Sequence, residues 1–189
     1  MNLQDALNNR KILNNKENIT ILTNKIVDDF FYKNPNAKTF IIPDSVTEIG
    51  CCTFYGCSNL KEITIPDSVT EIGDWAFYNC KNLKDIIIPD SVTKIGKNSF
   101  KYCKNLTEIT IPDSVTEIGN DAFNSCENLK EIIFQNPSSL NQIKLGENVF
   151  SGCDLENINI TFLDNNLDKE DMTNSISDTK KDENKKESR

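Results

Sequence analysis

Apolar residues recur along the middle of this chain at a fixed interval of 23 residues. Each interval carries a Leu-x-x-Ile-x-Ile rhythm, then Pro-Asp-Ser-Val-Thr, then Ile-Gly, and later a Phe and a Cys. The repeated columns are Pro43, Pro66, Pro89 and Pro112; Gly50, Gly73, Gly96 and Gly119; Phe54, Phe77, Phe100 and Phe123; and Cys57, Cys80, Cys103 and Cys126. A unit this short cannot bury its own apolar side chains, so the pattern predicts stacked units that share one core.

The alternation of Ile63 and Ile65 predicts a short strand with one buried face. Pro66 ends that strand, because proline has no N–H to donate to a neighbouring strand. Stacked units would align these strands in parallel, about 4.8 Å apart. The sequence therefore predicts one parallel sheet that runs along the stack.

The second half of each unit predicts a turn. Gly73 is expected to take a positive φ there. Asp74 is expected to cap a short helical turn that carries Ala76, Phe77 and Cys80. Val and Ile side chains before the glycine would point back into the core.

The repeats divide the chain into a cap, a solenoid and a tail. Residues 1–19 are predicted to form an N-terminal cap, and residues 20–163 the solenoid. Within it we expect a degenerate unit at 20–42, regular units at 43–65, 66–88, 89–111 and 112–134, and a longer terminal unit at 135–160. Residues 164–189 are dominated by Asp, Asn, Lys, Glu and Ser, which predicts a disordered charged tail.

The degenerate unit follows from stepping back one interval from the first clear repeat. Ile19 then takes the place of Ile42, and Phe31 the place of Phe54. If this alignment is right, Phe31 is buried and stacks on Phe54.

The units resemble a known family. Their consensus, Leu-x-x-Ile-x-Ile-Pro-Asp-Ser-Val-Thr-x-Ile-Gly-x-x-Ala-Phe-x-x-Cys, is similar to the BspA-like, or Treponema-type, leucine-rich repeat. The resemblance implies a leucine-rich-repeat horseshoe, with a parallel β-sheet on the concave face and short helical turns or loops on the convex face. It also implies adhesion and protein binding, often at microbial cell surfaces, and it supplies no catalytic residues.

Composition narrows the function classes. The formal net charge is −8, whereas a nucleic-acid binder usually carries a basic patch, so a neutral or basic protein is the expected partner and nucleic acid is not. The chain has no His for a Ser-His-Asp triad and no glycine-rich phosphate loop. We therefore expect no enzymatic activity, no cofactor and no metal.

The sequence also bears on location. Residues 1–15 contain no apolar run typical of a secretory signal, and no stretch approaches the roughly 18 apolar residues that cross a bilayer. These features predict a cytoplasmic protein that does not insert into a membrane. The family resemblance favours the alternative, a cell-surface or secreted protein that uses non-classical export or a further N-terminal segment.

Two columns could carry chemistry. Cys57, Cys80, Cys103 and Cys126 lack the paired thiolates or His of a zinc site, and the better interpretation is a column of buried, reduced core residues. Cys51 and Cys52 stand outside this column, so at least one could be exposed and redox-responsive. A second column, Asp44, Asp67, Asp90 and Asp113, could hold calcium, but it lacks the dense ligands of calcium loops and turn capping is favoured.

The candidate binding surface is the outward face of the predicted sheet. Two columns of side chains should lie there: Glu62, Asp85, Glu108 and Glu131, continued by Asn157; and Thr64, Ile87, Thr110 and Ile133, continued by Asn159. Like charges on neighbouring strands are destabilising, so the acids indicate either a site for a basic partner or mere copying of repeats. Neighbouring Lys61, Lys84 and Lys130 could soften the repulsion.

Two alternatives stay open. The protein could be structural and self-assemble through the faces or ends of its solenoid. If the sheet face is not the binding site, the aromatic side chains Tyr55, Trp75 and Tyr78 on the convex side are the next candidates.

Overall fold

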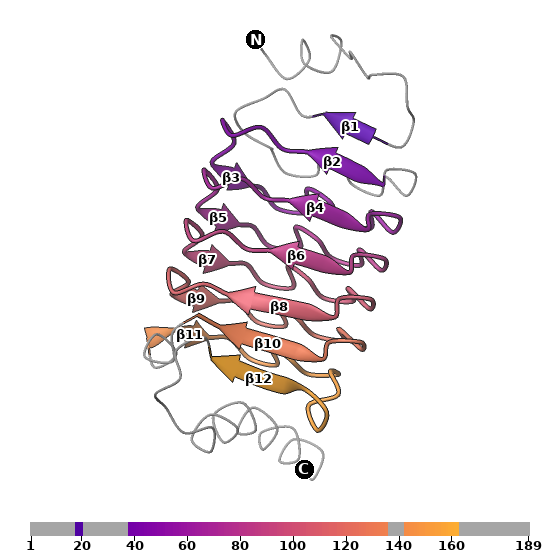
Figure 1. The fold of residues 1–189 in the computed structure, drawn as a ribbon, viewed down its shortest axis with the longest axis vertical. Helices are drawn as coiled ribbons and strands as arrows, with labels where there is room; N and C mark the ends of the chain where they lie inside the picture. Colours follow the sequence, from indigo (N-terminus) through magenta and orange to yellow (C-terminus); the bar gives the residue numbers. More distant parts are fainter. Residues whose placement is uncertain (1–17, 21–37, 136–141, 163–189) are drawn as a thin grey trace, which may run out of the picture.

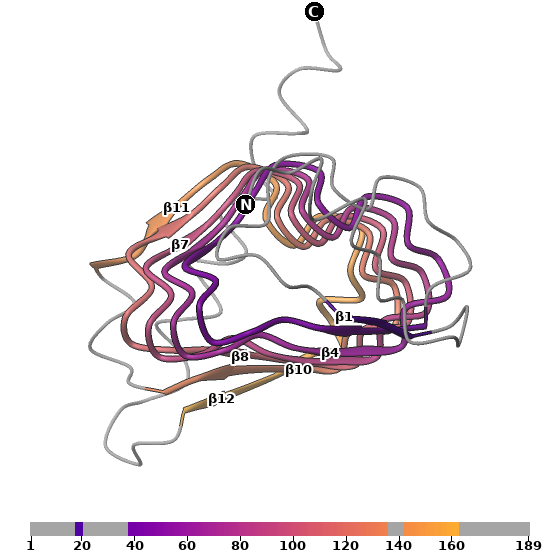
Figure 2. The same cartoon turned by 90° about the horizontal axis from the view of Figure 1, so that it is seen from above.

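The computed structural model describes residues 18–20, 38–135 and 142–162. Each repeat makes one turn of a solenoid, and the turns superpose when the stack is viewed from above (Figure 2). Residues 1–17 of the predicted cap, the predicted tail at 164–189 and Phe31 of the degenerate unit lie outside the described residues.

A seven-stranded parallel sheet, here called the front sheet, contains one strand from each unit. Its strands, in spatial order, are β1 (Asn18–Thr20), β2 (Thr39–Ile41), β4 (Glu62–Thr64), β6 (Asp85–Ile87), β8 (Glu108–Ile111), β10 (Glu131–Phe134) and β12 (Asn159–Phe162). Figure 1 shows them stacked from the N-terminal to the C-terminal end. The central isoleucines Ile63, Ile86 and Ile109 point into the core, which confirms the predicted parallel sheet.

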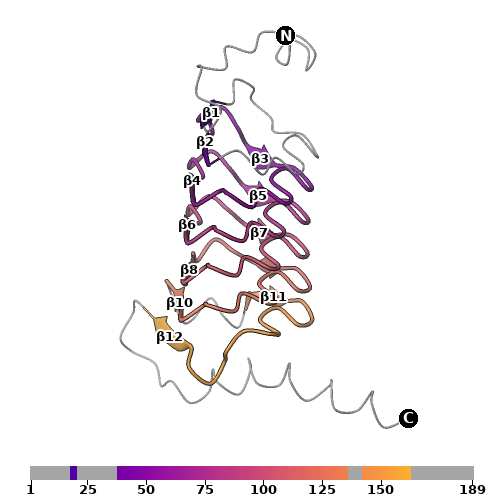
Figure 3. The ribbon, with the colours of Figure 1, turned by 90° about the vertical axis from the view of Figure 1, so that its right-hand side faces the viewer.

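A second parallel sheet, the back sheet, was not predicted. It consists of β3 (Glu48–Ile49), β5 (Glu71–Ile72), β7 (Lys94–Ile95), β9 (Glu117–Ile118) and β11 (Lys144–Leu145). In Figure 3 the front sheet runs along the left edge of the stack, and the strands of the back sheet lie to its right. The sequence placed Ile72 in the core correctly, but a two-residue strand is too short to show an alternation.

Turns take the place of the predicted helical segments, and no α-helix occurs within the described residues. Tyr78 donates its N–H to the carbonyl of Trp75 at 3.1 Å, and Phe77 donates to Ser99 of the next unit at 2.7 Å. Trp75 and Asn79 have left-handed φ values of 53° and 60°. Such residues interrupt a right-handed helix, so the segment bonds to neighbouring units instead.

Phenylalanine rings form the spine of the core. The rings of Phe54, Phe77, Phe100, Phe123 and Phe150 stack in sequence, with centroid separations of 5.0, 5.1, 5.2 and 5.4 Å. All five side chains are buried, which confirms the predicted Phe column. Offset stacking of aromatic rings adds to the free energy gained by burying them.

The glycine column has a different role from the one predicted. Gly73 and Gly96 are not left-handed; among the described glycines only Gly56 and Gly152 are. A Cβ atom on Gly96 would lie 2.5 Å from the carbonyl carbon of Gly73. These glycines let successive backbones approach closely, so the prediction of a positive φ at Gly73 is wrong.

The register at both ends also differs from the prediction. Ile19 pairs with Phe40, whereas the repeat interval aligned it with Ile42. At the other end Glu131 pairs with Asn159, and Ile133 pairs with Thr161. The two outward columns therefore continue at Asn159 and Thr161, two residues later than the predicted Asn157 and Asn159. Stacking of Phe134 on Phe162, 5.9 Å apart, accompanies this register.

Candidate partner-binding face

The predicted acidic residues form one column across the front sheet. Glu62 pairs with Asp85, and Glu108 with Glu131. Glu62, Asp85 and Glu108 are exposed and Glu131 is half-buried. We call these four residues the acidic column.

A column of isoleucine and threonine runs beside it. Thr64 pairs with Ile87, Ile87 with Thr110, and Thr110 with Ile133. Ile41 pairs with Thr64 and extends this Ile/Thr column by one strand, an extension that the sequence analysis missed. Ile41 is 55% exposed and Ile87 is 78% exposed, and among the described residues no other large hydrophobic side chain is so exposed. The face therefore presents carboxylates next to exposed aliphatic groups.

The acidic column is not neutralised by direct ion pairs. Within the described ranges, none of its carboxylates lies within 4.0 Å of a lysine nitrogen. The Thr107 hydroxyl donates to Asp85 at 3.5 Å, and the Thr161 hydroxyl donates to Glu131 at 2.8 Å. Lys61 and its equivalents are exposed just before the strands, but they soften the repulsion only through space.

The back sheet handles its outward charges differently. The outward column of the back sheet is Glu48, Glu71, Lys94, Glu117 and Lys144. Glu48 pairs with Glu71, and from Glu71 onward the charges alternate in sign. Lys94 lies 3.1 Å from Glu71, and Lys144 lies 3.9 Å from Glu117. The hydrogen bond with Glu71 and its negative charge raise the pKa of Lys94. Opposite charges on neighbouring strands are stabilising, so from Glu71 onward this column relieves the repulsion that the acidic column keeps.

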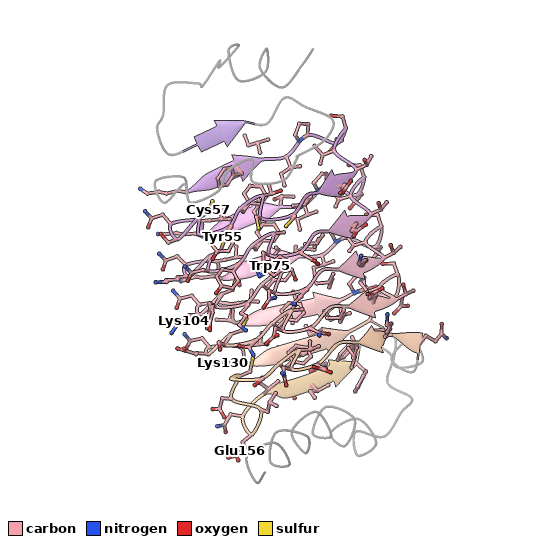
Figure 4. The ribbon with its side chains drawn as sticks, turned by 180° about the vertical axis from the view of Figure 1, so that it is seen from behind. Tyr55, Cys57, Trp75, Lys104, Lys130 and Glu156 are labelled. Carbon is pink, nitrogen blue, oxygen red and sulfur yellow. The ribbon has the colours of Figure 1, made fainter. Side chains whose placement is uncertain are left out.

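Charge is also segregated between the edges of the solenoid. In the view from behind, nitrogen-tipped side chains gather along the edge where Lys104 and Lys130 are labelled, and oxygen-tipped side chains gather along the opposite edge (Figure 4). The predicted aspartate column, Asp44, Asp67, Asp90 and Asp113, is exposed. The neighbouring serines bond across units: the Ser68 hydroxyl donates to the carbonyl of Val46 at 2.6 Å.

The described residues contain no group of three or more His, Cys, Asp or Glu side chains arranged to hold a metal ion. They also contain no helix long and apolar enough to span a bilayer.

The alternative binding site, Tyr55, Trp75 and Tyr78, has aromatic rings that are largely covered by neighbouring side chains. Tyr55 stacks on Tyr78 with ring centroids 4.6 Å apart, and Tyr78 meets Tyr102 edge-on at 5.4 Å. The Lys97 ammonium lies 5.6 Å from the centre of the Trp75 ring. Ring faces that are covered in this way offer a partner less surface than the Ile/Thr column does.

The cysteine column belongs to the core, as predicted. Cys57, Cys80, Cys103 and Cys126 are fully buried. The thiols of Cys80, Cys103 and Cys126 donate to phenylalanine carbonyls of the preceding unit at 3.1, 3.2 and 3.3 Å. Burial raises the pKa of these three thiols, chiefly through desolvation of the thiolate.

The buried thiols predict a loss of stability in alkali. Burial raises the pKa of Cys153 from 9.0 to about 11. The thiol form then stabilises the fold fully below pH 9, and that contribution falls as the pH rises toward the folded-state pKa. Urea unfolding under reducing conditions should show a free energy of unfolding that declines above pH 9, by at most about 1.4 kcal/mol per pH unit for each thiol. A Cys153→Ala variant should decline less steeply, and an unchanged slope would contradict this origin.

Comparison with known proteins supports the repeat architecture. The family model of the BspA type leucine-rich repeat region, in six copies, matches residues 24–156 and 97–175. A leucine-rich repeat protein of T. pallidum is similar in fold, with 23% sequence identity, a TM-score of 0.63 and coverage of 87% of this chain and 84% of its own. No curated protein sequence matches the chain.

Two further solved structures share the fold. A leucine rich cell surface protein of Faecalibacterium prausnitzii is 31% identical, with a TM-score of 0.54 over 80% of this chain. The pneumococcal vaccine antigen PcpA is 22% identical, with a TM-score of 0.57 over 78% of this chain. The chain covers only 49% and 42% of these two proteins.

Proposed function

The chain belongs to the BspA type leucine-rich repeat family, and on that premise we propose that it is a non-catalytic module that binds a protein partner through the outer face of the front sheet. The residues that we assign to the contact are the acidic column and the neighbouring Ile/Thr column, namely Glu62, Thr64, Asp85, Ile87, Glu108, Thr110, Glu131 and Ile133.

One observation carries the proposal. If repeat copying alone explained the acids, the outward column of the back sheet should be equally uniform. That column instead carries lysine at Lys94 and Lys144, and each lysine forms an ion pair with a neighbouring glutamate. The front-sheet column changes from Glu62 to Asp85 and back to Glu108, yet it keeps its negative charge at each step. A feature that is unfavourable for stability and yet retained in all four regular units is typical of a binding surface. Asn159 takes this position in the terminal unit.

The chemistry of the face defines the partner. Successive outward residues on one strand are about 7 Å apart, so carboxylates and aliphatic groups form two adjacent parallel rows. A segment that carries Lys or Arg beside an aliphatic residue is complementary to both rows. Charge attraction would speed its association, and salt would screen that attraction.

We propose a cell-surface location for this activity. The support is the F. prausnitzii protein, whose name places it at the cell surface. Protease treatment of intact source cells should degrade the chain while a cytosolic marker survives. If the chain is protected until the cells are lysed, the protein is cytoplasmic and the proposed location is wrong.

The binding face can be tested with a displayed library of random peptides. Peptides selected on the wild-type chain should be rich in Lys or Arg and carry an aliphatic residue. In the quadruple variant Glu62→Gln, Asp85→Asn, Glu108→Gln and Glu131→Gln, their association rate should fall about tenfold at low salt, because the charge that attracts them is gone. The midpoint of thermal unfolding should stay equal or rise.

The exposed aspartates provide a matched control. The variant Asp44→Asn, Asp67→Asn, Asp90→Asn and Asp113→Asn removes the same number of charges, one per unit, away from the face. It should keep most of the association rate. Equal losses in both variants would show that only net charge matters, and unchanged binding by the acidic-column variant would exclude this face.

A further inference from the structure

We propose that Cys51 and Cys52 are a redox-active pair that closes reversibly into a disulfide between adjacent residues. Their Sγ atoms lie 3.5 Å apart, in a thiol-to-thiol contact. Both side chains are half-buried. The site is separate from the proposed binding face, because it lies on the turn that follows the back sheet.

The pair is local to one repeat. The equivalent positions in the following units are Asp74 and Trp75, then Lys97 and Asn98. The cysteines of the repeat column, Cys57, Cys80, Cys103 and Cys126, are buried, and the thiols of the last three donate to backbone carbonyls. Two adjacent thiols at a turn that carries Asp and Trp, or Lys and Asn, in the following units are therefore not part of the repeat pattern.

The backbone at this turn holds the two side chains together. Cys52 has a left-handed φ of 54°, the same conformation as Trp75. Its N–H donates to the carbonyl of Asp74 at 2.9 Å, and its carbonyl accepts the N–H of Tyr55 at 3.0 Å. The bonds fix the turn within the ladder of the solenoid, so the thiols meet without a loop rearrangement.

Adjacency predicts that the disulfide is easily reduced. Consecutive Cα atoms are about 3.8 Å apart, whereas the cysteines of ordinary disulfides have Cα atoms about 4.4 to 6.8 Å apart. The closed ring contains the Cys51–Cys52 peptide bond and is therefore strained. Strained disulfides have more oxidising potentials and exchange readily, as a reversible site requires.

The reaction needs a low-molecular-weight disulfide as oxidant. The thiolate of one cysteine attacks a sulfur of the oxidant, which forms a mixed disulfide and releases one thiolate. The second cysteine loses its proton and attacks the mixed disulfide, which closes the Cys51–Cys52 bond and releases the second thiolate. The protein loses two electrons and two protons, and the oxidant becomes two thiol molecules.

The test uses the full chain in glutathione buffers of rising oxidised fraction. After acid quenching, denaturation and alkylation, the reduced protein should carry an alkyl group on each of its seven cysteines. The oxidised protein should carry two fewer, with no glutathione attached, and dithiothreitol should restore all of them. Seven alkyl groups at every ratio, or a glutathione adduct that never closes, would overturn the proposal.

Three variants identify the pair. Cys51→Ser and Cys52→Ser should each stop at the glutathione adduct, because the second thiol is missing. Cys57→Ala should close like the wild type, although Cys57 lies between the same two lysines, Lys38 and Lys61, and shares a tryptic peptide with the pair. If Cys57→Ala failed to form the intramolecular disulfide, the bond would involve Cys57 and the proposal would be refuted. This outcome can be read even if a serine variant fails to fold. The peptide selection described above tests the binding face. It can be run on the oxidised and the reduced chain, so its result is independent of whether the disulfide forms.

Discussion

Replacing Phe100 with alanine is expected to lower the free energy of unfolding by about 4 kcal/mol, as is usual for a large aromatic side chain removed from a packed core. Phe100 is fully buried, and its ring stacks on Phe77 at 5.1 Å and on Phe123 at 5.2 Å. The truncation removes contacts on both ring faces and leaves a cavity between two units. In a solenoid each unit is stabilised by its neighbours, so the defect should weaken the coupling of the two halves.

Urea unfolding followed by circular dichroism measures this loss. Tyr102→Ala is the matched control, because Tyr102 belongs to the half-buried ladder on the surface and meets Tyr78 at 5.4 Å. It should lose about 1 kcal/mol, since its truncation leaves no enclosed cavity. Equal losses in the two variants would mean that the phenylalanine spine is not the dominant contact. A second unfolding transition in Phe100→Ala would show that the halves had uncoupled.

Gly96→Ala is expected to cost about 3 kcal/mol, the upper range for an overpacked site. The new Cβ atom would lie 2.5 Å from the carbonyl carbon of Gly73 and 2.6 Å from the nitrogen of Asp74. Both obstacles are backbone atoms within the inter-unit ladder, where Gly96 itself donates to the carbonyl of Ile72 at 2.8 Å. They cannot rotate away as a side chain would, so the units must separate.

A Gly96→Asn variant distinguishes two reasons for a glycine at this position: a left-handed turn, or close approach of the backbones of neighbouring units. If Gly96 served to allow a left-handed turn, Gly96→Asn would be tolerated better than Gly96→Ala, because asparagine adopts that conformation more readily. Close approach of the backbones predicts that asparagine is at least as harmful, since its Cβ meets the same atoms. Thermal unfolding of the two variants decides between them. A stable Gly96→Asn variant would restore the turn explanation.

The sequence by itself determined the features that repeat. The interval placed Phe77, Cys80 and Ile63 in the core, and burial confirms each of them. It also placed Glu62 beside Asp85, because identical units that stack in register bring equivalent residues together. Such columns depend only on the period and on which residues are apolar, and both can be read from a single chain.

Only the tertiary structure decided features that depend on the distance between units. The back sheet rests on two-residue strands such as Glu71–Ile72, which have too few residues for a sequence pattern and form because neighbouring turns supply their hydrogen bonds. The role of Gly96 follows from how closely the backbones approach, which its own sequence neighbours do not encode. The end registers fall where the interval changes, so there packing, as between Phe134 and Phe162, replaces the period as the guide to alignment. The contact of Cys51 with Cys52 likewise required the left-handed turn that brings the two sulfur atoms together.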